Sequence, residues 1–296
     1  YNTAVGQQAL ATLTTGGHNT AIGAQCLDAL TTGNYNTAVG RQALTANTTA
    51  GNNTAVGYQS LAQSTTGGSN TAVGDTALNA LSTGSYNTAV GRAAMSNGAV
   101  TGDYNVAVGH QAGRANTTGS NNVYIGRNAA YNATTANHNT IIGASASAYY
   151  LTTGTYNTTL GCDAGQNLTT GGSNTCIGNQ AGYSITTGGT NVCIGNQAGY
   201  NLVNTESSQL WIARSNDNAN NAGAWIYGNN SGACYQGNNS STWTTSSDVR
   251  LKKNITDNSK GLSEINQLRV TNFEYKTEDE IDMSEFPLAE GDPRQV

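Results

Sequence analysis

Charged residues are scarce in this 296-residue chain, at 10% of the sequence, against about 25% in ordinary globular domains. Residues 1–247 contain six acidic residues and five arginines, and all four lysines come after residue 250. This part of the chain therefore offers no basic patch to nucleic acid or to an anionic membrane surface. It also has no apolar run near the ~18 residues of a membrane span. We expect neither nucleic-acid binding nor membrane insertion.

Residue types that bind metals or carry out catalysis are sparse as well. The three histidines are scattered and the five cysteines form no Cys-x-x-Cys pair, so we expect no metal and no cofactor. Residues 1–200 contain no Gly-x-Ser-x-Gly, no phosphate-binding loop and no His-Glu-x-x-His, and their acidic residues are isolated. We therefore expect this region not to be an enzyme.

Proline is nearly absent, and both prolines fall in the last ten residues. Ten of the seventeen acidic residues follow residue 250, so the composition changes near Ser247. The chain begins in the middle of a repeated phrase, without a methionine, and we interpret it as a segment of a longer protein.

Glycine, threonine and asparagine are abundant by contrast, and they are organised in an internal repeat. The phrase Asn-Thr-Ala-Val/Ile-Gly, with small variations, occurs twelve times. Nine of the eleven steps between copies are 17 residues, and the two that end at Asn105 and Asn157 are 18. Asn opens every copy, Gly closes it, and Val, Ile or Leu always precedes that Gly. The copies begin at Asn2, Asn19, Asn36, Asn53, Asn70, Asn87, Asn105, Asn122, Asn139, Asn157, Asn174 and Asn191.

The residue pattern of each repeat predicts a short strand, a bend at the Gly, a second short segment and a Gly-rich turn. One repeat has too few apolar side chains for a core of its own, so we expect the copies to stack into a solenoid roughly 55 Å long, at ~4.8 Å per coil. The asparagines would then form a ladder of amide hydrogen bonds. A helical solenoid is excluded because Gly, Thr and Asn fill the repeat. The predicted fold is all-β, a parallel β-solenoid or β-roll of about twelve 17-residue repeats, over residues 1–207.

The positions that vary between repeats leave two questions open. The residue before each Asn is often aromatic, as at Tyr35, Tyr86 and Tyr104. Such a row could dock a glycan, or it could cover turn edges and pack against a neighbouring chain, which is the favoured interpretation. Cys176 and Cys193 occupy the same position in successive repeats. They could form a disulfide, but small buried apolar residues are the better interpretation.

The repeated phrase resembles the Asn-Ser-Val-Ala-Ile-Gly repeats of trimeric autotransporter adhesin heads, although the repeat is longer here. The resemblance covers residues 1 to about 200. It implies a left-handed parallel β-roll in which three identical chains pack side by side, and therefore a homotrimer.

The C-terminal part departs from the repeat. Residues 208–246 contain all three tryptophans and short apolar stretches, and we interpret them as a β neck in which chains bury aromatic side chains against each other. Residues 247–296 begin with Ser-Asp-Val-Arg-Leu-Lys-Lys-Asn-Ile. A helix-like Leu-x-x-Ile-x-x-Leu and a strand-like Val-Thr-Asn-Phe-Glu-Tyr-Lys follow, which predicts a small α+β segment.

This last run resembles the start of the intramolecular chaperone domain of endosialidase-type phage tail spikes. The resemblance implies a domain that trimerises the fibre ahead of it and then cuts itself off, with Ser247 as the nucleophile and Lys252 as its base. The plainer alternative is that the Ser-Asp pair caps a turn and the lysines are solvated. We interpret residues 247–296 as the start of this domain, truncated at Val296.

Together these features favour a structural fibre protein, the shaft and distal part of a homotrimeric phage tail fibre or tail spike on the virion. It would recognise a host-surface glycan or receptor that the sequence does not identify. The alternative is a bacterial cell-surface trimeric adhesin. A glycan-degrading enzyme would need clustered carboxylates, and an ice-binding solenoid would need a flat threonine face; the repeats indicate neither.

Overall fold

The computed structural model describes residues 1–145, 147–202, 205–213 and 224–236. The chain divides into two compact units, Tyr1–Thr242 and Trp243–Val296, and the second lies wholly outside the described residues. The predicted α+β segment at 247–296 therefore falls outside them too, as does much of the predicted neck.

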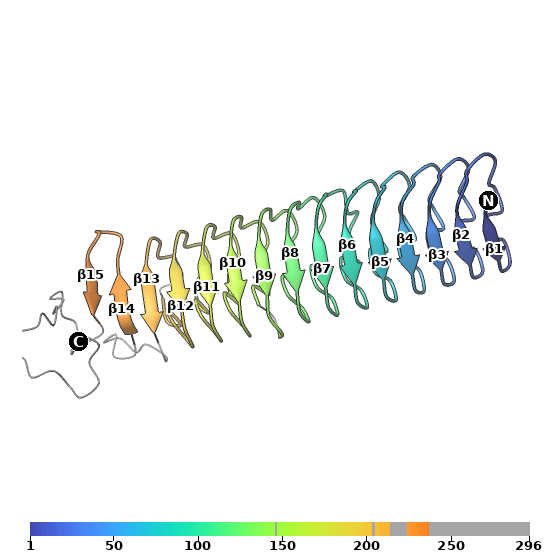
Figure 1. The fold of residues 1–296 in the computed structure, drawn as a ribbon. Helices are drawn as coiled ribbons and strands as arrows, with labels where there is room; N and C mark the ends of the chain where they lie inside the picture. The colour runs from blue at the N-terminus through green and yellow to red at the C-terminus, as the bar shows by residue number, and fades with distance from the viewer. Residues whose placement is uncertain (146, 203–204, 214–223, 237–296) are drawn as a thin grey trace, which may run out of the picture. The chain divides into compact units, whose positions relative to one another are not determined.

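The first unit is a single sheet of short strands that follow one another in chain order (Figure 1). Strands β1 to β13 pair in parallel, and β13–β14 and β14–β15 pair in antiparallel fashion. The strands are β1 (Thr3–Val5), β2 (Thr20–Ile22), β3 (Thr37–Val39), β4 (Thr54–Val56), β5 (Thr71–Val73), β6 (Thr88–Val90), β7 (Val106–Val108), β8 (Val123–Ile125), β9 (Thr140–Ile142), β10 (Thr158–Leu160), β11 (Thr175–Ile177), β12 (Val192–Ile194), β13 (Leu210–Ala213), β14 (Ala224–Gly228) and β15 (Cys234–Gln236).

The predicted fold class is confirmed: the described residues form an all-β parallel solenoid of about twelve turns, with repeats of about 17 residues and no helix. We call the stretch from one strand to the next a coil and number it by its strand. Successive coils align the same position of the phrase, so that Thr71 pairs with Thr88 and Val73 with Val90. The 18-residue step before Asn105 keeps this register, because Thr88 pairs with Val106.

The glycine that ends each strand is required by the stacking of coils. Gly74 has a φ of +139°, and a Cβ at this position would lie 2.6 Å from the carbonyl oxygen of Gly91 in the next coil. Any other residue would force the two backbones apart, since side-chain carbons do not approach an oxygen so closely. The bend predicted from this Gly is thus also a point of close backbone contact between coils.

The core lies between the strand, which contributes its middle side chain, and the segment that follows the strand. In the first six coils the strand residue is Ala and the residue six positions later is large in most of them, as in the pair Ala72 and Leu78. In the coils towards the C-terminus the strand residue is the larger of the two, and the residue six positions later is small. Gly182 is the later residue where the strand holds Cys176, and a Cβ on this Gly would lie 2.5 Å from the cysteine sulfur. The two positions therefore share one volume, as close packing demands.

Tyr124 marks the change between these two arrangements. It is the largest fully buried side chain, and its ring occupies the space beside Gly113, where a Cβ would lie 2.5 Å from a ring carbon. Its hydroxyl has no hydrogen-bond partner within the described part of the chain. Burial raises the pKa of Tyr124 well above its usual value.

The antiparallel end of the sheet contains two of the three tryptophans. Trp211 in β13 packs against the core and stacks on Tyr227 of β14, with ring centroids 5.6 Å apart. Trp225 in β14 is 62% exposed. Trp243, the third, lies outside the described residues.

Candidate functional site

The twelve phrase asparagines line up along the solenoid, and from Asn19 to Asn191 each is at most 1% exposed. The Oδ1 of each accepts the backbone N–H of the next Asn, or of Gln209 at the end of the row. The Nδ2 of each donates to a backbone carbonyl in the turn 14 or 15 residues later. Each amide therefore joins a strand start, a turn and the neighbouring coil. It fills a structural position and presents no surface to a ligand.

The aromatic residues before the asparagines are exposed and stack in short runs. Tyr86 and Tyr104 lie parallel with centroids 4.9 Å apart, and His138 stacks on Tyr156 at the same distance. Tyr35, which stacks on a histidine, is 61% exposed. Residues with small or polar side chains, such as Ser69 and Asn121, interrupt the row. These stacks are separate pairs or triplets on the surface.

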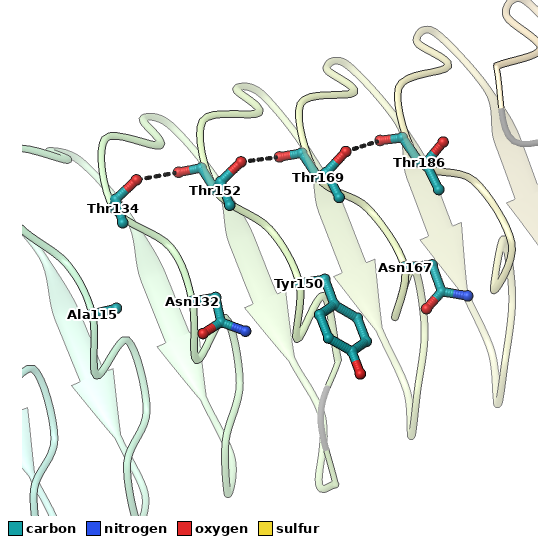
Figure 2. Close-up of a pocket in the computed structure, with 8 residues that line it drawn as sticks. All are labelled: Ala115, Asn132, Thr134, Tyr150, Thr152, Asn167, Thr169 and Thr186. Atoms are coloured by element: carbon teal, nitrogen blue, oxygen red, sulfur yellow. Dashed lines mark hydrogen bonds between the residues drawn. The ribbon is translucent and has the colours of Figure 1, made fainter.

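An open groove of about 600 Å³ lies on the C-terminal half of the solenoid. Its lining comes from coils 7 to 11, and it contains no charged side chain. Figure 2 shows Tyr150 between Asn132 and Asn167, beside a row of threonines. The groove is lined by Ala115, Asn132, Thr134, Tyr150, Thr152, Asn167, Thr169 and Thr186.

Hydrogen bonds between coils fix the threonine side of the groove. The hydroxyls of Thr134, Thr152 and Thr169 each donate to the carbonyl of the next threonine in the row, at 3.2, 3.1 and 3.2 Å (Figure 2). Each oxygen keeps acceptor capacity after this bond. The row is a line of hydroxyls at the spacing of the coils, held in one orientation by the backbone.

Aromatic side chains surround Tyr150. Tyr149 meets it edge to face, with centroids 5.0 Å apart and planes at 81°. Tyr149 in turn stacks on Tyr131, whose hydroxyl accepts a 2.7 Å hydrogen bond from the Arg114 guanidinium. Tyr150 itself is 49% exposed. It is a half-exposed aromatic surface in contact with the ring of Tyr149.

A second pair of tyrosines continues this aromatic region. Tyr183 and Tyr200 stack with centroids 4.8 Å apart. Burial raises the pKa of Tyr183, and the nearby Tyr200, Asp163 and Tyr150 act in the same direction. The residues that line the groove offer an aromatic ring, hydroxyls and amides, and none of them is charged. The groove can stack and hydrogen-bond with a ligand, and it has no acid or base pair for hydrolysis.

Sequence reasoning missed this groove because its residues lie ten to thirteen positions after the phrase Asn, and its Asn and Tyr residues fall where the repeats vary. The available signal was the Tyr149-Tyr150 doublet together with Asn132 and Asn167, where earlier repeats have Ala29 or Ala46. Only the coil-to-coil register shows that these side chains are neighbours.

The cysteines are free thiols where the structure describes them. Cys176 and Cys193 face each other as register partners and are both buried, as expected for small apolar residues. A hydrogen bond with the Cys176 thiol raises the pKa of Cys193, and burial raises it further. The described residues hold no group of three or more His, Cys, Asp or Glu side chains able to bind a metal ion. They also include no helix long and apolar enough to cross a membrane.

Ser247 and Lys252 lie outside the described residues, so their roles as nucleophile and base stay predictions. Comparison of the chain with curated proteins and with solved structures gives no match. Residues 247–288, however, match the family described as chaperone of endosialidase. The segment with the candidate nucleophile is therefore similar to that chaperone family, and it follows a β-solenoid in the same chain.

Proposed function

We propose that this chain is the shaft and distal part of a homotrimeric phage tail fibre or tail spike, which recognises a host surface. The observation that carries the proposal is the order of the parts: a long β-solenoid is followed by residues similar to the endosialidase chaperone. This order fits a tail-fibre-like structural protein. The repeats alone would suit a bacterial surface adhesin equally well, and the chaperone match favours the fibre.

The outer side of the strands supports the trimeric part of the proposal. The third residue of every strand from β1 to β12 is Val, Ile or Leu, and its side chain faces away from the core. Several are notably exposed, from 58% at Val5 to 47% at Leu160 and 37% at Ile194. An exposed apolar row of this length marks an interaction surface in a soluble protein. Two further copies of the chain would remove the row from water.

The proposed self-cleavage rests on Ser247 and Lys252, which stand at the start of the matched residues. A lysine with a lowered pKa can take the proton of a serine hydroxyl, whose oxygen then attacks the carbonyl carbon of the adjacent peptide bond. The C–N bond breaks, the lysine returns the proton to the leaving amine, and water hydrolyses the ester that remains. In this proposal the solenoid carries no catalysis, and the break beside Ser247 is a maturation step.

The test is the native mass of the purified 1–296 chain by light scattering, with a denaturing mass spectrum of the same sample. We expect three chains per particle and a break beside Ser247 that Ser247→Ala abolishes. Val73→Glu places a charge on the apolar strand row and should yield monomers. Thr66→Glu, on an exposed turn, should leave the trimer intact. A stable wild-type monomer would refute the trimeric fibre, and cleavage that persists in Ser247→Ala would refute the Ser247 and Lys252 assignment.

A further inference from the structure

We infer that the groove around Tyr150 is a carbohydrate-binding site that takes a short, neutral oligosaccharide. The inference deepens the proposed host recognition by naming the site and the class of ligand. It rests on three observations: the groove contains residues that the fold does not need, it presents unused polar groups next to an aromatic ring, and its lining carries no charge.

The scaffold does not require Tyr150 or Asn167. The backbone N–H of each bonds to the next coil, at the carbonyls of Gln166 and Tyr183. Ala29 and Ala46 make the same backbone bond in the N-terminal half. An alanine at this position is therefore sufficient for the backbone hydrogen bonding of the coil. The large side chains that replace it in the C-terminal half have another role.

The side chains of the groove offer hydrogen-bonding capacity that the protein itself does not use. The Tyr150 hydroxyl and the Asn167 amide make no hydrogen bond within the described part of the chain. Asn132 uses one Nδ2 proton on the Tyr149 carbonyl, at 3.1 Å, and keeps its Oδ1. Figure 2 shows both amides beside the Tyr150 ring, so donors and acceptors flank a flat apolar surface.

This combination matches the chemistry of a sugar. A pyranose ring has an apolar C–H face that packs on an aromatic ring, and hydroxyls at its edge that both donate and accept hydrogen bonds. A groove of about 600 Å³ is within the usual range for small-ligand sites. The threonine hydroxyls that line one side repeat from coil to coil, so they can meet successive sugar units.

The absence of charge in the lining selects neutral sugars over acidic ones. A carboxylate or sulfate in this groove would meet no lysine or arginine among the lining residues, and Asp163 lies near Tyr183 on the same side. An anionic sugar would lose hydration without gaining a cationic partner. Arg114 is already bound to the hydroxyl of Tyr131.

The experiment is an NMR titration of the 1–296 chain with neutral di- to tetrasaccharides of glucose, galactose, mannose and N-acetylglucosamine, beside sialylated and sulfated counterparts. We expect at least one neutral series to bind, and Tyr150→Ala to weaken its Kd by about tenfold or more. Asn167→Ala should also weaken it. Tyr86→Ala removes another half-exposed tyrosine, elsewhere on the solenoid, and should leave Kd unchanged.

Three results would overturn the inference: no neutral oligosaccharide binds, only the anionic ones bind, or Tyr150→Ala binds as the wild type does. Misfolding is checked by the thermal midpoint of each variant, which alanine at this position should preserve. The outcome is separable from the oligomeric test. A trimer without sugar binding removes this inference alone, and a monomer that binds neutral sugar through Tyr150 removes the trimeric fibre alone.

Discussion

Replacing Asn122 by alanine, in the middle of the asparagine row, should cost far more stability than the same change at the end of the row. The Oδ1 of Asn122 accepts the backbone N–H of Asn139 at 3.0 Å, and its Nδ2 donates to the carbonyl of Ala136 at 2.8 Å. Asn122→Ala leaves both backbone groups buried without a partner. Each such group costs about 1–3 kcal/mol, so we expect a loss of about 3–5 kcal/mol in the free energy of unfolding.

Asn2→Ala is the matched control. Asn2 makes the same two bonds, to Asn19 and Gly16, but it lies exposed on the first coil, where water can replace its amide. We expect a loss below about 1 kcal/mol. Both variants would be measured by urea unfolding followed by circular dichroism, with the m-value checked for two-state behaviour. Equal losses at the two positions would show that hydrogen bonding within the row does not explain the strict asparagine.

Three further substitutions test the core and the stacking of coils, each by the same urea unfolding. Tyr124→Phe removes a buried hydroxyl without a partner and should raise stability by about 1 kcal/mol; a loss would mean that the hydroxyl is bonded. Gly74→Ala should destabilise by about 3 kcal/mol through backbone contact with the next coil, whereas Gly232→Ala, with no atom within 4 Å, should cost about 1 kcal/mol. Gly182→Leu should destabilise alone, but combining it with Cys176→Ala should recover more than about 1 kcal/mol; simple additivity would contradict the shared volume.

The fold could be predicted because its cause repeats along the chain. The register is visible in the spacing of residues such as Asn122 and Asn139, and the strand in the Val, Ile or Leu before each Gly. The hydrogen-bond partners of the asparagine side chain were harder to predict. One hydrogen bond of each asparagine goes to a turn carbonyl, as from Asn122 to Ala136, and no pattern in the phrase indicates this partner.

The groove could not be predicted for a related reason. Asn132, Tyr150 and Asn167 are separated by 18 and 17 residues and belong to the variable stretch of the repeat. The residues next to the phrase pointed instead to Tyr35 and its equivalents, which stack in separate groups. Which side chains are neighbours across coils depends on how the backbones of successive turns align. The coil that contains Tyr150 carries one extra residue, which shifts this alignment in the sequence.

The exchange of core volumes has a consequence for how such a protein can change length over generations. In the first coils each strand contributes an Ala that packs beside a large side chain. If gene recombination removed or added one 17-residue repeat there, each core residue would still meet a neighbour of the same size. Near Tyr124 this freedom ends, because removing that coil would leave Gly113 facing empty space. The N-terminal block can thus lengthen or shorten as a spacer, while the coils that carry the groove are inherited as a set.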